Sequence, residues 1–205
     1  MSRQMIKAIT FDLDGVYFRN GKSRFIANLV NLGVFETEAT RVFLKSDEMN
    51  LRYKTGALSD HEFWTWALQE WGLDLSVEEI IGLMIGGYDV DKQVAKVVQE
   101  VRRKGYKTLV CSNNFAARID GLQMRFGFLG DFDATAMSYE VGAAKPSREI
   151  FEVLVERAGV LAHEIAYADD DASKLAGVDA LGIQTFVYQG FEKFLASLRQ
   201  LGVDV

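Results

Sequence analysis

The sequence predicts an α/β fold: a Rossmann-like, doubly wound parallel β-sheet with a helical segment inserted after the first strand. Three observations lead to this prediction. Short apolar runs alternate with helical patterns, which is typical of a parallel sheet covered by helices on both faces. Polar clusters follow several of the runs. Residues 17–89 contain helical patterns without a strand signal.

The first strand is predicted at residues 6–11, a short apolar run rich in branched side chains. It ends in the turn signal Asp12-Leu13-Asp14-Gly15, so a loop is expected to follow. Further apolar runs predict the other four strands at residues 106–111, 132–137, 165–168 and 184–188. Because ligands bind beyond the carboxyl ends of the strands in such sheets, the polar clusters there form the candidate site.

Helical patterns fill the intervals between these strands, at residues 91–104, 115–126, 147–158 and 172–181. The inserted segment predicts four more helices, at residues 24–32, 36–45, 61–71 and 77–85, and Ser59 and Ser76 each begin a capping box. We therefore expect a core of residues 1–16 and 90–205 and a small helical domain of residues 17–89. The glycines at its two ends act either as hinges or as turn residues; they are Gly15, Gly21, Gly86 and Gly87.

Net charge and cysteine content exclude several classes of function. The chain has 205 residues, with 23 Lys and Arg against 29 Asp and Glu, a net charge of −6. This acidic balance gives no electrostatic footprint for nucleic acid or an anionic membrane. The single Cys111 excludes a disulfide within the chain and a zinc site of several cysteines. The N-terminus leads into a strand-like run without an apolar signal region, so a cytoplasmic location is expected.

Acidic residues follow two of the predicted strands. Asp12 and Asp14 are two positions apart, so both carboxylates can face one site in extended chain. Asp169, Asp170 and Asp171 follow another strand and can complete the same cluster. Close carboxylates repel unless a cation intervenes, and a hard divalent ion such as Mg²⁺ prefers their oxygens. The alternative is that these residues only form a turn and cap the next helix.

Two further polar residues stand at strand ends or loops. Ser112 follows a predicted strand and is expected to cap the next helix, where exposed N–H groups can also bind phosphate. Lys145 precedes the only proline, Pro146. It is either a solvated lysine before a helix or a fixed cation that balances carboxylates and a phosphate.

Together these clusters resemble the four motifs of the haloacid dehalogenase superfamily, in the family's order and across nearly the whole chain. The matching segments are Asp12-Leu13-Asp14-Gly15-Val16, Ser112-Asn113, Lys145-Pro146 and Ala168-Asp169-Asp170-Asp171. The inserted helices resemble the cap of the helical-cap branch, and residues 55–60 with Phe63 resemble its sugar-phosphatase-like members. One departure is Asp171, where many relatives have a small polar residue; we expect it to cap the following helix.

The resemblance implies a Mg²⁺-dependent phosphatase that acts on a small soluble phosphate ester. It implies that Asp12 attacks phosphorus and forms an aspartyl-phosphate, and that Asp14 protonates the leaving alcohol and then deprotonates water. Ser112, Asn113 and Lys145 would bind the phosphoryl group. Asp12, the backbone carbonyl of Asp14 and Asp170 would ligate Mg²⁺, with Asp169 supporting the site. Dehalogenating members usually lack the second aspartate, so Asp14 favours phosphate-ester chemistry.

Three other functions are compared with the phosphatase. A phosphosugar mutase shares the core and cap. A phospho-receiver module also has acidic clusters on a parallel sheet, but it needs no inserted segment of this length. An inactive binding relative would not be expected to keep the full set of motif residues.

Several other residues are expected to be structural. The spacing of Trp64, Leu68 and Trp71 is that of the buried face of a helix. His61 and His163 are expected to be exposed, and Cys111 is expected to be a buried strand-end thiol. Four cations of the insert are expected to form a solvated face, although they can also meet a distal anionic or sugar group; they are Arg41, Lys45, Arg52 and Lys54.

Overall fold

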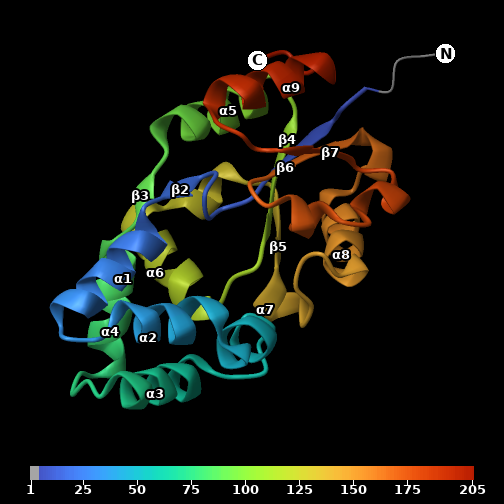
Figure 1. Cartoon of the computed structure of the whole chain (residues 1–205). Helices are drawn as coiled ribbons and strands as arrows, with labels where there is room; N and C mark the ends of the chain where they lie inside the picture. The colour runs from blue at the N-terminus through green and yellow to red at the C-terminus, as the bar shows by residue number, and fades with distance from the viewer. Residues whose placement is uncertain (1–4) are drawn as a thin grey trace.

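A five-stranded parallel β-sheet forms the centre of the computed structural model, which describes residues 5–205 apart from the side chain of Asp179 (Figure 1). The strand order is β5-β4-β1-β6-β7, and every neighbouring pair is parallel. The strands are β1 Ala8–Phe11, β4 Lys107–Ser112, β5 Ala134–Met137, β6 Ile165–Asp169 and β7 Gln184–Val187. The predicted parallel sheet is confirmed, and each strand begins and ends within two residues of its expected position.

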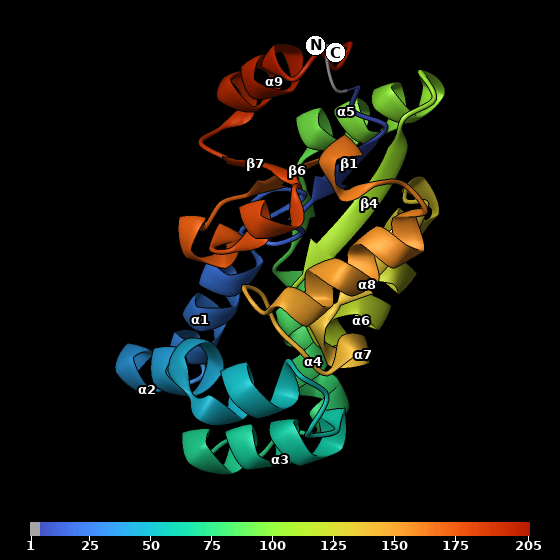
Figure 2. The same ribbon diagram turned by 90° about the vertical axis from the view of Figure 1, so that its right-hand side faces the viewer.

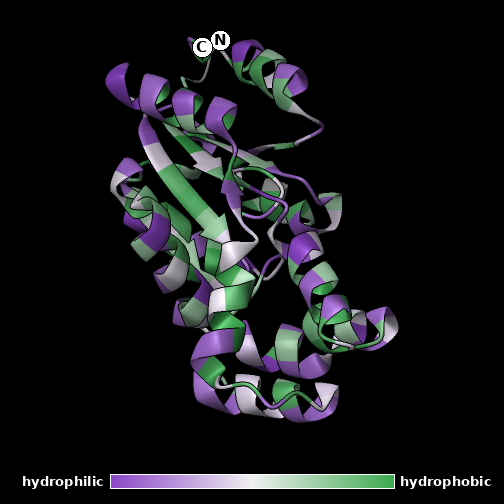
Figure 3. Ribbon diagram, turned by 90° about the vertical axis from the view of Figure 1, so that its left-hand side faces the viewer, coloured by the Kyte–Doolittle hydropathy of each residue, from purple (hydrophilic) through white to green (hydrophobic). Residues whose placement is uncertain are grey.

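Helices cover both faces of the sheet, because side chains of a strand alternate between the two faces. Ile9 and Phe11 pack into one cluster with α5 (Lys92–Arg103), α6 (Ala116–Phe126) and the C-terminal α9 (Phe191–Gln200). Ala8 packs into a second cluster with α8 (Arg148–Ala158). Figure 3 shows these helices with hydrophobic residues on one side and hydrophilic residues on the other. The doubly wound arrangement is therefore confirmed.

The inserted helices lie beyond the carboxyl ends of the strands, as Figures 1 and 2 show from two directions. In chain order they are α1 Gly21–Asn31, α2 Glu36–Thr40, the π-helical η1 Arg41–Lys45 and η2 Glu48–Tyr53, α3 Asp60–Trp71 and α4 Val77–Gly86. Both predicted capping boxes are present, at Ser59 and Ser76. The buried face of α3 is also confirmed, since Trp64, Leu68 and Trp71 all lie in the core.

Two expectations for the insert are wrong. The segment 36–45 is not one α-helix, because the chain changes from α-helical to π-helical turns at Arg41. The insert also begins and ends in strands: β2 (Phe18–Arg19) pairs antiparallel with β3 (Asp89–Val90). Each strand has only two residues, which is too short to produce a period-two pattern in the sequence.

Further differences lie in the C-terminal half. Segment 172–181 forms two short 3₁₀ turns, η5 (Ala172–Leu175) and η6 (Val178–Leu181), rather than one helix. Gly177, with a positive φ of 78°, separates them. Helix α9 was not predicted, nor were the short elements η3 (Phe128–Asp131), α7 (Ser138–Val141) and η4 (Ala162–Glu164). Within residues 5–205, no helix has the length and apolar character needed to cross a membrane.

Candidate active site

The side chain of Lys145 lies at the centre of a buried polar cluster at the carboxyl ends of β1, β4 and β6. Its Nζ is 2.9 Å from Asp12 Oδ1, 2.5 Å from Asp169 Oδ2 and 2.8 Å from Tyr167 Oη, and it donates to the carbonyl of Cys111 at 2.9 Å. Burial lowers the pKa of Lys145, but the two carboxylates raise it more, so the lysine stays charged. Lys145 is therefore a fixed cation, as one of the two sequence alternatives required.

Asn113 holds the backbone of that lysine in place. Its amide Nδ2 donates to the Lys145 carbonyl at 3.0 Å, and its Oδ1 accepts from the Lys145 N–H at 2.6 Å. The peptide bond between Lys145 and Pro146 is cis. Pro146 does not begin α8, which starts two residues later at Arg148.

Ser112 does not cap α6, which corrects the expectation from the sequence. The helix begins four residues later, at Ala116, with Phe115 at the N-cap position and no side-chain cap. Instead, the Ser112 hydroxyl accepts from Asn114 Nδ2 at 3.3 Å, inside the sheet edge. Both Ser112 and Asn113 line the cavity that contains Asp12 and Lys145. Their placement suits contact with a phosphoryl group, but it does not depend on a helix N-terminus.

Three carboxylates gather where a metal ion would bind. Oxygens of Asp12, Asp169 and Asp170 all lie within 4.8 Å of one another, which fits the donor set that Mg²⁺ prefers. Burial raises the pKa of Asp170, and the carboxylates of Asp12 and Asp169 raise it further, against the lowering effect of Lys174. Gly15 makes room for this arrangement, because a Cβ there would lie 2.1 Å from Asp170 Oδ2. The three carboxylates therefore have the spacing and charge of a metal site.

Lys174 of η5 reaches the same three carboxylates. Its Nζ lies 3.8 Å from Asp12 Oδ2, 3.6 Å from Asp169 Oδ1 and 3.7 Å from Asp170 Oδ1. Burial lowers the pKa of Lys174, but Asp12 and Asp169 raise it more. The sequence analysis missed this residue, although its position four residues after Asp170 could have drawn attention to it. Asp171 caps η5 by accepting from the Ser173 N–H, as expected, and it also lines the cavity that contains Asp12 and Lys145.

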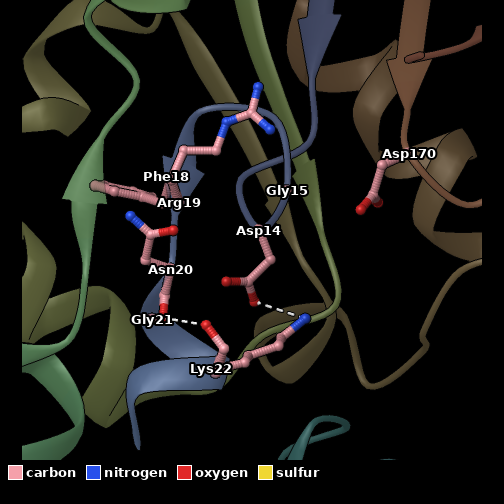
Figure 4. Close-up of a pocket in the computed structure, with 9 residues that line it drawn as sticks. Asp14, Gly15, Phe18, Arg19, Asn20, Gly21, Lys22 and Asp170 are labelled. Carbon is pink, nitrogen blue, oxygen red and sulfur yellow. Dashed lines mark hydrogen bonds and ion pairs between the residues drawn. The ribbon is translucent and has the colours of Figure 1, made fainter. Parts of the chain in front are cut away.

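Asp14 lines the same cavity as Asp12, as the spacing predicted, but its carboxylate does not join the cluster of Asp12, Asp169 and Asp170. Its carboxylate forms ion pairs with Arg118 Nη1 and with Lys22 Nζ, the latter at 3.2 Å. Burial raises the pKa of Asp14, but these two cations outweigh that effect and hold it below its usual range. Figure 4 shows Asp14 and Lys22 pointing toward each other, with Asp170 across the cavity.

Arg118 is a buried cation that the sequence analysis missed. It lies on α6, and its guanidinium stacks over the ring of Phe115 at 4.3 Å and faces Tyr88 at 5.7 Å and Phe43 at 5.9 Å. Nothing in the local sequence distinguishes it from an exposed helix arginine. Its ion pair with Asp14 joins α6 to the loop after β1, 104 positions apart in the chain.

The cavity over these groups lies between the sheet edge and the insert, and its volume is about 510 Å³. Asp12, Ser112 and Lys145 line it from the core, while Asn50 and Lys54 line it from the insert. A neighbouring cavity of about 350 Å³ is lined by Asp14, Lys22 and Asp170, among others (Figure 4). The two share Asp14 and Lys22, so they adjoin at the loop after β1 and the start of α1.

Lys54 departs from the expected solvated face. It is half-buried in the cavity wall, whereas Arg41, Lys45 and Arg52 are exposed. His61 is exposed, as expected, but His163 is half-buried. Cys111 is buried, as expected, and burial raises the pKa of its thiol to about 12.

Comparison with known proteins places this geometry in a family. The sequence profile described as haloacid dehalogenase-like hydrolase matches residues 6–182. Among curated proteins, D-ribitol-5-phosphate phosphatase of Bacteroides thetaiotaomicron is 24% identical over 188 residues, which cover 89% of this chain and 91% of that protein.

Solved structures agree in fold. A haloacid dehalogenase family enzyme of Bacteroides thetaiotaomicron, in complex with magnesium and inorganic phosphate, has a TM-score of 0.80 and 23% identity, covering 93% of this chain and 98% of that one. A haloacid dehalogenase-like hydrolase of Porphyromonas gingivalis has a TM-score of 0.79 and 21% identity, covering 98% and 100%. At this level of identity the likeness concerns the fold.

Proposed function

The chain belongs to the haloacid dehalogenase-like hydrolase family, and from this premise we propose that it is a Mg²⁺-dependent phosphatase. Its substrate is a small phosphomonoester, and the reaction proceeds through an aspartyl-phosphate. The observation that supports this most directly is the pairing of Asp12 with Lys145 in a buried site that also contains Asp169 and Asp170.

Asp12 is the proposed nucleophile. Its carboxylate oxygen forms a bond to phosphorus as the bond between phosphorus and the ester oxygen breaks. Dividing hydrolysis in this way replaces one difficult step with two easier ones. Lys145 keeps the carboxylate oriented and offsets charge on the phosphoryl oxygens, together with the Ser112 hydroxyl and the Asn113 segment.

Asp14 is the proposed proton carrier. It gives a proton to the leaving alcohol oxygen and then accepts one from the water that attacks the phosphorylated Asp12, whose bond to phosphorus breaks. While Asp14 is paired with Arg118 and Lys22 its pKa is too low for it to hold a proton. We therefore propose that its side chain turns away from this pair, toward the leaving oxygen, when substrate enters.

Asp12, Asp170 and the Asp14 backbone carbonyl are the proposed Mg²⁺ ligands, supported by Asp169. Their donor atoms are the hard oxygens that suit this ion. When bound, Mg²⁺ supplies positive charge that neutralises the repulsion between the phosphate and the carboxylates. Lys174, which lies between the same carboxylates, must then move aside.

Residues 17–89 are the proposed cap, which excludes water and contacts the part of the substrate beyond the phosphate. The name of the Bacteroides thetaiotaomicron relative, a D-ribitol-5-phosphate phosphatase, supports a substrate of metabolite size. The size of the cavity between insert and sheet edge agrees with this, since sites for small molecules typically measure about 300–1,000 Å³.

The test is release of inorganic phosphate from a panel of phosphorylated metabolites and an aryl phosphate, with Mg²⁺ and after chelation. We expect turnover only with the ion. A phosphosugar mutase would return an isomer, and a phospho-receiver would keep a stable adduct. With the aryl phosphate, Asp14→Asn should accumulate a phosphoryl adduct on Asp12, detectable by rapid quench and intact mass. An adduct on any other residue, or full turnover without a divalent ion, would reject the mechanism.

A further inference from the structure

Lys54 lines the cavity from the insert, as Lys22 does, but unlike Lys22 it has no acidic partner among the described residues. It follows η2, and its Nζ donates to Asn50 Oδ1 at 2.8 Å. Among residues 5–205, no carboxylate lies within 4.0 Å of this ammonium. Burial lowers the pKa of Lys54 to about 7, and the neighbouring Arg118 and Lys22 contribute to the decrease. Folding therefore desolvates the Lys54 ammonium without giving it a carboxylate partner, which is energetically unfavourable.

Asn50 is locked in the orientation that receives Lys54. Its Nδ2 donates to the carbonyls of Leu44 at 2.9 Å and Ser46 at 3.1 Å, which leaves its Oδ1 to face the lysine. An ammonium has three N–H donors, and this bond uses one of them. Two donors of Lys54 therefore remain for a ligand in the cavity.

The backbone at Lys54 is anchored to the core. Ser138 Oγ donates to the Lys54 carbonyl at 2.5 Å, and the ring of Tyr53 stacks on Phe115 at 4.4 Å. Gly56, at a φ of 76°, passes so close to the core that a Cβ there would lie 2.5 Å from the Tyr139 carbonyl oxygen. These contacts fix the position of the lysine relative to the catalytic carboxylates in this conformation.

The charges around the cavity cancel in sum but not in pairs. Five cationic side chains face five carboxylates; they are Lys22, Lys54, Arg118, Lys145 and Lys174, against Asp12, Asp14, Asp169, Asp170 and Asp171. One Mg²⁺ adds two positive charges, and a phosphomonoester dianion removes two. Of these five cations, Lys54 alone has no carboxylate within 4.0 Å among the described residues.

We infer that the substrate is a phosphorylated carboxylic acid whose carboxylate binds Lys54 while its phosphate binds beside Lys145. This inference rests on the proposed phosphatase function and names the substrate class. A carboxylate supplies one negative charge, which matches the single unpaired ammonium of Lys54, whereas a second phosphate would supply two. A hydroxyl group would leave the lysine uncompensated in a desolvated wall, which is the unfavourable state that a ligand should relieve.

The test uses two matched pairs of esters that differ only in a carboxylate or a hydroxymethyl group. These are 3-phosphoglycerate with glycerol 3-phosphate, and 5-phosphoribonate with ribitol 5-phosphate. We expect the protein to prefer the acid of at least one pair by about 30-fold in kcat/KM, the range of a charge-assisted hydrogen bond. Lys54→Met should remove most of this preference, and Lys54→Arg should keep it. Lys45→Met, at an exposed lysine of the same insert, is the control.

The outcomes separate this inference from the function on which it rests. Hydrolysis of an aryl phosphate without preference for the acid in either pair would overturn the carboxylate assignment. It would also be overturned if Lys54→Met, with an unchanged melting temperature, lowered kcat/KM equally for both members of a pair. Failure of the wild-type protein to hydrolyse any ester in the presence of Mg²⁺ would instead reject the phosphatase function.

Discussion

The two walls of the active-site cavity differ in how completely their charges are paired. On the core side, Lys145 has four partners, two of them carboxylates. On the insert side, Lys54 has one neutral partner, Asn50. Burial acts on both lysines, yet the pKa of Lys145 is raised and that of Lys54 is lowered to about 7. The number of acidic neighbours decides whether the pKa of the lysine rises or falls.

This difference indicates a division of labour. A cation that is fully paired in the free protein is preorganised and needs no reorganisation when charge moves during the reaction. A cation that lacks an acidic partner is stabilised most when an anionic ligand binds. Its interaction therefore discriminates between ligands that carry a negative charge at that position and ligands that do not. The core wall should therefore control whether an ester is hydrolysed, and the insert wall should control which ester is hydrolysed.

The largest effect that this division predicts is at Asp12. Asp12→Asn removes the anionic nucleophile, so kcat should fall by about 10⁴-fold or more for every ester, whatever its distal group. Phosphate release and intact mass measure turnover and adduct. Asp171→Ser is the matched control, because it removes a nearby negative charge but keeps a side chain able to cap η5. Substantial turnover by Asp12→Asn would break the assignment of chemistry to the core wall.

The junction between the two walls should show the next largest effect. Arg118 pairs with Asp14 and packs against Phe43 of the insert and Phe115 of the core. Arg118→Met leaves a mostly buried carboxylate without its main partner and should lower the free energy of unfolding by about 3 kcal/mol. Adding Asp14→Asn to the same chain should restore much of this loss in a urea titration. If the double variant were as unstable as the single one, packing rather than the ion pair would explain the loss.

The sequence predicted the features that depend on short local patterns. Apolar runs gave the five strands, and the capping boxes at Ser59 and Ser76 gave two helix starts. Strand ends also brought Asp12, Asp169 and Asp170 to one edge, because carboxyl ends of parallel strands meet there. Such features depend on a few consecutive residues and on the topology that they imply.

The remaining part of the site depends on contacts between distant segments. Arg118 on α6 and Lys54 in the turn after η2 have no distinguishing local signal, and only tertiary packing buries Arg118 and half-buries Lys54 in the cavity wall. The orientation of Asp14 toward Arg118 likewise results from a contact across 104 positions. The two-residue strands β2 and β3 form through pairing with each other, so neither has a signal of its own. Sequence patterns therefore predicted the core wall better than the insert wall.

A smaller effect is expected for the affinity of the core wall for Mg²⁺. Lys174 lies 3.6–3.8 Å from the three candidate ligand carboxylates, so an ion must displace it. Lys174→Met should remove this competition and tighten Mg²⁺ binding by about tenfold, since like charges so close interact by several kcal/mol in a partly screened site. Isothermal titration with Mg²⁺ alone measures this. Lys92→Met, at an exposed position on α5, corrects for total charge. A Mg²⁺ affinity that is unchanged or weaker in Lys174→Met would contradict the competition between Lys174 and the ion.

The narrowest predicted effect, confined to KM for one class of ester, concerns pH and the insert wall. Lys54 has a pKa of about 7 in the free protein, so it loses its charge as the pH rises through neutrality. The charged groups that face it are Arg118 of α6, Lys22 of α1, Lys174 of η5 and Asp14 of the loop after β1. An arginine keeps its charge throughout this range. The ratio of KM for the preferred phosphorylated acid, wild type over Lys54→Arg, should therefore stay constant below pH 7, rise above it, and level off at about the 30-fold that the charge-assisted bond contributes.

The same ratio for the matched hydroxymethyl ester should stay flat, since that ester presents no charge to residue 54. Taking ratios between two proteins cancels the titration of the phosphate and of Asp14 and Asp170, which both proteins share. A flat ratio for the acid would mean that Lys54 remains charged in the free protein or does not contact the carboxylate. A direct titration of the Lys54 ammonium by NMR separates these two cases: a normal lysine pKa would show that the wall is less desolvated than its geometry indicates. A pKa near 7 with a flat ratio would place the carboxylate elsewhere in the cavity.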